Sequence, residues 1–126
     1  MKTAFFLHAA LAGVFTTVAL WAAEPAQTLT EAAKITSPFE RARALRDLTA
    51  RADAKACAAD FAQAQALSGP LRTECLAAVV SRWAKVDAPA ALAACLSATP
   101  AYRQREALRA LFAAWAQSSP QAAFDA

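Results

Sequence analysis

Residues 82–96 read RWAKVDAPAALAACL and residues 114–124 read AWAQSSPQAAF, so the second stretch repeats the first at an offset of 32 residues. Trp83 corresponds to Trp115 at this offset. The apolar residues before these tryptophans show the same offset: Leu76, Val79 and Val80 correspond to Leu108, Leu111 and Phe112. A repeat length of roughly 20 to 50 residues is typical of stacked helical units. We therefore expect stacked antiparallel helical hairpins in a short α-solenoid-like repeat with a period of about 32 residues.

Capping residues and prolines mark where these helices begin. Ser37 followed by Pro38 predicts one start, and Glu40 predicts a capping box with Ser37. Further starts are predicted at Asp53, Ser68–Pro70, Asp87, Thr99–Pro100 and Ser119–Pro120. After the first start, an apolar stripe is predicted to contain Phe39, Ala42, Leu45, Leu48, Thr49 and Ala52. These signals predict a helical-repeat domain over residues 36–126, with the alternative that it is incomplete at its C-terminus.

The composition also favours an all-α fold. Alanine accounts for 39 of the 126 residues, whereas glycine occurs only twice and Val and Ile together occur six times. Strands favour β-branched residues, while helices favour alanine and leucine. Two glycines are also too few for the glycine-rich loops that bind nucleotide phosphates.

The N-terminal segment predicts export. Lys2 precedes an uncharged run, and residues 4–23 are long enough as a helix to cross the hydrocarbon core of a bilayer, about 30 Å. Because positive charge stays on the cytoplasmic side, the rest of the chain is expected in the periplasm or cell envelope. Residues 1–23 are either a cleaved signal peptide or a retained N-terminal membrane anchor, a single transmembrane helix, and both alternatives remain open. Residues 24–35 are expected to be a linker or a short helix.

The charges of the chain predict solvated helix faces. The net charge is only +3, which does not favour nucleic acid as a partner. Arginines gather on two predicted helices, at Arg41, Arg43, Arg46 and Arg51 and at Arg103, Arg105 and Arg109. We expect pairs three residues apart, Glu40–Arg43 and Glu106–Arg109, to satisfy part of this charge. The alternative is a patch for anionic lipid, polysaccharide or nucleic acid.

No catalytic, cofactor-binding or metal-ligating residue is assigned from the sequence, and no cofactor is expected. The one histidine, His8, lies in the N-terminal apolar run. Cys57, Cys75 and Cys95 fall on apolar faces without metal-ligand spacing, so we expect buried thiols or, in an exported chain, one disulfide and one free thiol. Trp83 and Trp115 are predicted to be core residues rather than an aromatic binding platform.

The two repeated stretches resemble the W-A-x-x-D-P-x-A-A helical-repeat proteins, which are exported bacterial proteins with no assigned reaction. Residues 35–48, ITSPFERARALRDL, resemble a companion segment of the same proteins, and the likeness covers residues 36–124. The Asp-Pro pair of that motif is replaced here by Asp87-Ala88-Pro89 and Ser118-Ser119-Pro120. The resemblance implies a helical repeat and no catalytic residue.

These observations predict a non-enzymatic protein-interaction or scaffold module of the cell envelope. The last predicted helix opens at Ser119, close to Ala126, and leaves Phe124 near apolar residues that nothing later in the sequence covers. A protein partner or self-association is therefore expected at this end. The alternatives are a small exported hydrolase-like enzyme and a fragment of a longer repeat protein.

Overall fold

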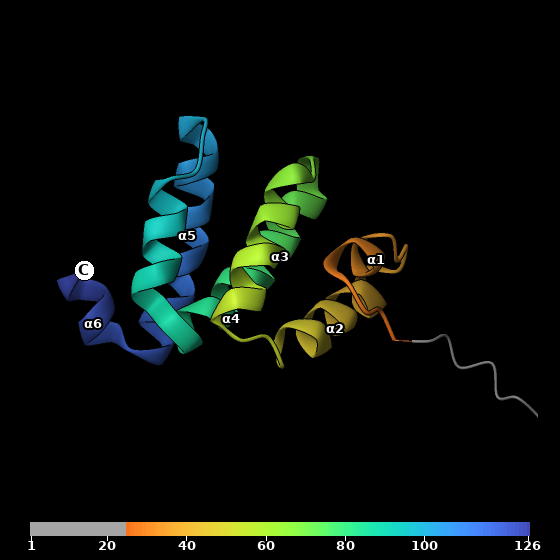
Figure 1. Cartoon of the computed structure of the whole chain (residues 1–126), viewed down its shortest axis with the longest axis horizontal. Helices are drawn as coiled ribbons and strands as arrows, with labels where there is room; N and C mark the ends of the chain where they lie inside the picture. The colour runs from red at the N-terminus through yellow and green to blue at the C-terminus, as the bar shows by residue number, and fades with distance from the viewer. Residues whose placement is uncertain (1–24) are drawn as a thin grey trace, which may run out of the picture.

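The computed structural model describes residues 25–126, which form six α-helices in chain order (Figure 1). The helices are α1 (Leu29–Ala33), α2 (Pro38–Thr49), α3 (Ala54–Ala66), α4 (Gly69–Leu96), α5 (Ala101–Ser118) and α6 (Pro120–Asp125). No strand occurs between residues 25 and 126, so the all-α prediction is confirmed there. The predicted signal peptide or anchor, residues 1–23, lies outside the described residues. Within the described part, no helix combines the length and apolar character needed to cross a membrane.

Side-chain caps begin two of the helices, α2 and α3, where the sequence predicts them. Ser37 accepts a hydrogen bond from the Glu40 backbone N–H at 3.4 Å, and Asp53 accepts one from the Ala56 N–H at 2.8 Å. The complete capping box, however, lies at the start of α1. There Thr28 accepts from the Glu31 N–H, and the Glu31 carboxylate accepts from the Thr28 N–H. The prediction of a capping box at Ser37 was therefore half right, because only the Ser37 side of it forms among the described residues.

Asp87 divides α4 into a first arm (residues 69–86) and a second arm (residues 88–96). Its backbone is not helical (φ −157°, ψ 82°), and its carboxylate accepts a hydrogen bond from the Ala90 N–H at 3.1 Å. Ser119, between α5 and α6, has nearly the same backbone angles (φ −152°, ψ 74°). The two positions that match at an offset of 32 in sequence therefore share one backbone conformation.

The core runs through all helices except α6, and α4 is at its centre. α4 packs most extensively against α5 and α3, while α1 contacts α2, α3 and α4. Trp83 is 4% exposed and meets Phe61 edge-on, with 5.8 Å between the ring centroids. Figure 1 shows the elements following one another along the long axis, with α1 and α2 towards one end and α6 at the other.

Phe39 does not belong to the apolar stripe predicted for α2. Its side chain is 75% exposed, whereas Leu45 and Thr49 are buried. An α-helix turns about 100° per residue, so Phe39, six residues before Leu45, points about 120° away from it. The prediction assigned Phe39 to the apolar stripe because the residue is hydrophobic. Its angular position on the helix, however, lies outside that stripe.

Candidate functional site

The three cysteines are buried with free thiols, which agrees with the first of the two alternatives given by the sequence. Burial raises the pKa of all three thiols, to about 11 for Cys95, and nearby Asp60 adds to the effect at Cys57. A thiol becomes a nucleophile or metal ligand only as the thiolate. These side chains are therefore protonated core residues at neutral pH. Among the described residues, no group of three or more His, Cys, Asp or Glu side chains could hold a metal ion.

Both repeat tryptophans are core residues, as predicted. Trp83 and Trp115 are 4% and 8% exposed. Trp115 lies parallel to Phe112, with 5.9 Å between the ring centroids. Neither indole ring is presented to solvent as a binding platform.

Two ion pairs join α4 to its neighbours α2 and α5. Arg41 of α2 pairs with Glu74 of α4, with 2.9 Å between Nε and Oε2, and Arg72 of α4 pairs with Glu106 of α5 at 3.1 Å. The second carboxylate oxygen of Glu106 accepts a hydrogen bond from the Thr73 hydroxyl. This hydrogen bond and the Arg72 guanidinium lower the pKa of Glu106 against the opposing effect of burial. Both pairs are largely shielded from water, so they fix how neighbouring helices sit side by side.

These pairs correct the predicted charge pattern. The expected pairs Glu40–Arg43 and Glu106–Arg109 do not form within the described residues, where Arg43 instead approaches Asp47 at 3.9 Å. Helix packing brings Arg72 within reach of Glu106, and the Thr73 hydroxyl donates a second hydrogen bond to the same carboxylate. The signal was present in the sequence, because the arginines and the glutamates of the two pairs recur 31 and 32 residues apart.

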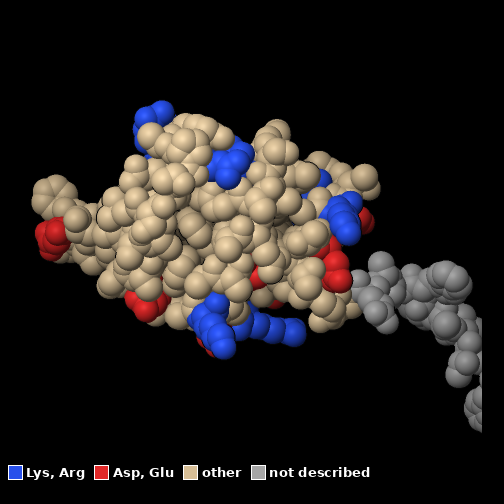
Figure 2. Space-filling view, turned by 45° about the horizontal axis from the view of Figure 1, so that its top comes forward, with Lys and Arg blue, Asp and Glu red and all other residues tan. Residues whose placement is uncertain are grey.

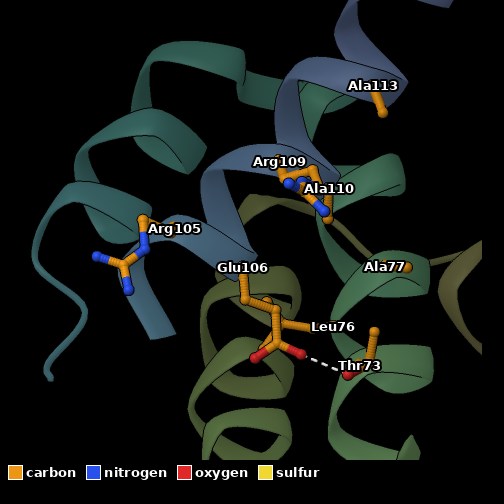
Figure 3. A pocket seen from close by; sticks show the side chains of 8 residues that line it. All are labelled: Thr73, Leu76, Ala77, Arg105, Glu106, Arg109, Ala110 and Ala113. Atoms are coloured by element: carbon orange, nitrogen blue, oxygen red, sulfur yellow. Dashed lines mark hydrogen bonds between the residues drawn. The ribbon is translucent and has the colours of Figure 1, made fainter. Parts of the chain in front are cut away.

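Two hollows flank the first arm of α4. The α4–α5 hollow has a volume of about 520 Å³ (Figure 3) and is lined by Thr73, Leu76, Ala77, Arg105, Glu106, Arg109, Ala110 and Ala113. The α2–α4 hollow has a volume of about 530 Å³ and is lined by Arg46, Thr49, Ala50, Ala77, Ala78, Ser81, Arg82 and Lys85. Ala77 lines both hollows, so they meet at a small side chain.

The α2–α4 hollow is positively charged. Arg46, Arg82 and Lys85 line it, and no carboxylate does. The Arg82 Nε donates a hydrogen bond to the Ala52 carbonyl at 3.0 Å, which holds the guanidinium in place. Arg46 belongs to a basic helix predicted from the sequence, and that predicted group does not include Arg82. The 32-residue offset is the sequence signal that relates the two arginines. It aligns Arg46 with Ala78, which lies one helical turn before Arg82.

In the α4–α5 hollow, the charges point in different directions. Figure 3 shows Glu106 facing Thr73, while the Arg105 side chain extends away from them. A third hollow, between α1 and α2, has a volume of about 830 Å³, and charged residues of both signs line it. Figure 2 shows one face of the molecule, on which Lys and Arg side chains form separate groups with uncharged atoms between them. On that face the basic charge is not continuous.

Comparison with known proteins finds no similar protein. No family model matches the chain, and no curated protein or solved structure matches it.

Proposed function

We propose that the chain is a short α-solenoid that acts as a non-enzymatic protein-interaction or scaffold module of the cell envelope. The repeating units are three helix pairs: α2 with α3, the first arm of α4 with its second arm, and α5 with α6. The ion pairs Arg41–Glu74 and Arg72–Glu106 support this division, because each joins the first helix of one unit to the first helix of the next. The matching backbone angles at Asp87 and Ser119, each between the two helices of a unit, also support it.

The observation that carries the proposal is the uncovered face of the third unit. In the second unit Leu76, Val80 and Ala84 are buried. Their counterparts 32 residues on are more open: Leu108 and Phe112 are half-buried and Ala116 is exposed. Phe124 of α6, which lies on this last unit, is 86% exposed. Exposed apolar surface forfeits about 25 cal/mol per Å², so a second protein surface would gain by covering this face.

The cell-envelope location is proposed from the sequence. Lys2 and the apolar run 4–23 favour export, and the resemblance to the W-A-x-x-D-P-x-A-A repeat proteins favours the same compartment. The partner is proposed to be a protein or a second copy of this chain, and nucleic acid is not proposed.

Site-specific photo-cross-linking in the native envelope tests the proposal. A photoreactive phenylalanine analogue replaces Phe124 in one variant and Phe39 in the matched control, because both are highly exposed phenylalanines on different helices. We expect a discrete adduct from position 124 and a much weaker one from position 39. Equal labelling at both positions, together with a clean monomer in light scattering at high micromolar concentration, would contradict the proposal.

A further inference from the structure

We propose that the α2–α4 hollow, continued across Ala77 into the α4–α5 hollow, binds an acidic peptide segment of a partner protein. The inference rests on the proposed function and names the chemistry of the partner. It concerns a surface separate from the uncovered face of the third unit, because the residues of that face, Leu108, Phe112, Ala116 and Phe124, line neither hollow.

The positively charged side chains that line the two hollows have no carboxylate partner within the described part of the chain. Five cations line them: Arg46, Arg82, Lys85, Arg105 and Arg109. None of the five has a carboxylate within ion-pair distance among residues 25–126. Glu106 is the one acid in the two linings, and Arg72 and Thr73 already engage it. Carboxylates from another chain would therefore meet unpaired positive charge on both sides of α4.

The Arg82 guanidinium is preorganised for binding a carboxylate ligand. Its half-buried side chain is tethered through Nε to the Ala52 carbonyl, and its terminal nitrogens make no hydrogen bond within residues 25–126. A guanidinium that is already ordered loses less side-chain entropy when it binds a carboxylate. The tether also holds the connection between α2 and α3, but that structural role does not account for Arg46 and Lys85 beside it.

The shape of the hollows favours a peptide over other polyanions. The lining of the α2–α4 hollow includes three small side chains, Ala50, Ala77 and Ala78, which leave room for a narrow chain. No aromatic side chain lines either hollow, whereas single-stranded nucleic acid is usually held by aromatic stacking. A flat bilayer surface would not reach into spaces between helices. An extended acidic segment with small residues between its carboxylates fits both the positive charge of the hollows and the small side chains of the lining.

The test measures fluorescence anisotropy of a labelled peptide of alternating Glu and Ala, using the full-length chain in a neutral detergent at low ionic strength. The Arg46→Glu/Lys85→Glu variant reverses two exposed charges in the α2–α4 hollow. The control, Lys34→Glu/Lys55→Glu, makes the same charge change at exposed positions outside both hollows. We expect the first variant to bind the peptide about ten-fold or more weakly than the native chain, and the control to bind within about two-fold of it.

Three outcomes would overturn the inference: no peptide binding, equal weakening in both variants, or displacement of the peptide by inorganic phosphate or oligo(dT) more readily than by unlabelled peptide. Arg46→Gln/Lys85→Gln keeps the test valid if charge reversal prevents folding, and the same order of affinities is expected. Failure here with an intact cross-link at Phe124 would refute the acidic-peptide site and leave the proposed function standing. Loss of that cross-link with peptide binding retained would refute the uncovered face and leave this site.

Discussion

Replacing Trp83 with alanine tests how much the core around α4 contributes to the free energy of unfolding. The indole is 4% exposed, lies on the first arm of α4 and meets Phe61 of α3 edge-on. Because α4 packs against both α3 and α5, loss of this side chain leaves a cavity in the core where α4 meets α3.

The expected cost follows from the burial. Truncating a buried Trp or Phe to Ala costs about 3–5 kcal/mol, and an aromatic pair contributes about 0.5–1.5 kcal/mol of such a loss. A small domain is stable by about 5–15 kcal/mol, so Trp83→Ala should remove a substantial fraction of the free energy of unfolding at room temperature.

The free energy of unfolding is measured by urea denaturation followed by far-ultraviolet circular dichroism. Trp83→Phe is the control, because it keeps a ring against Phe61 and removes an indole N–H that has no acceptor within residues 25–126. We expect the control to lose less than about 1.5 kcal/mol. A loss below about 1 kcal/mol for Trp83→Ala would refute the assignment of Trp83 to the core.

Three further predictions follow from the ionisable groups. Because burial raises the pKa of Cys95 from 9.0 to about 11, the unfolded chain loses this proton more readily. The free energy of unfolding, measured by urea titration, should therefore fall as the pH rises from 9.0 through about 11, and Cys95→Ala should reduce this fall. Ellman's reagent should find the thiols unreactive in the native chain at neutral pH and all reactive in denaturant, whereas fast native labelling would contradict their burial. Glu106→Gln should cost about 1–2 kcal/mol at neutral pH, since it breaks the pair with Arg72. Because the pKa of Glu106 is lowered from 4.5 in the folded state, its contribution is lost as the pH falls below that value. Glu106→Gln should then lose less stability on acidification than the native chain does, and an equal loss in both would contradict this role of Glu106.

Helix boundaries were predictable because capping is local chemistry. A short polar side chain such as Ser37, Asp53 or Asp87 reaches an N–H only three residues away. The burial of Trp83 and Trp115 was also predictable, since helical spacing places them with other apolar residues. Phe39 shows the limit of this reasoning, because hydrophobicity alone does not fix which way a side chain points on the helix.

The candidate hollows were less predictable because they depend on contacts between helices. The partner of Glu106 could not be chosen from spacing within α5, where Arg109 has a suitable separation and lies outside ion-pair distance. The choice of Arg72 depends on how α4 and α5 pack, and the same packing forms the hollow beside them. A sequence repeat suggests which helices are neighbours, but it does not state the distance between them.

The arginines of α2 and α4 have two different roles. Arg41 and Arg72 lie near the starts of α2 and α4, where each is within reach of a glutamate on α4 and on α5 respectively. Arg46 and Arg82 lie further along α2 and α4, beyond the reach of those glutamates, and Arg82 hydrogen-bonds only a backbone carbonyl. The inter-helix ion pairs therefore fix the spacing of α2, α4 and α5, and that spacing leaves a row of unpaired cations in the hollows between them. Because the apolar face at α6 and this charged row involve different residues, a partner could bind one without disturbing the other.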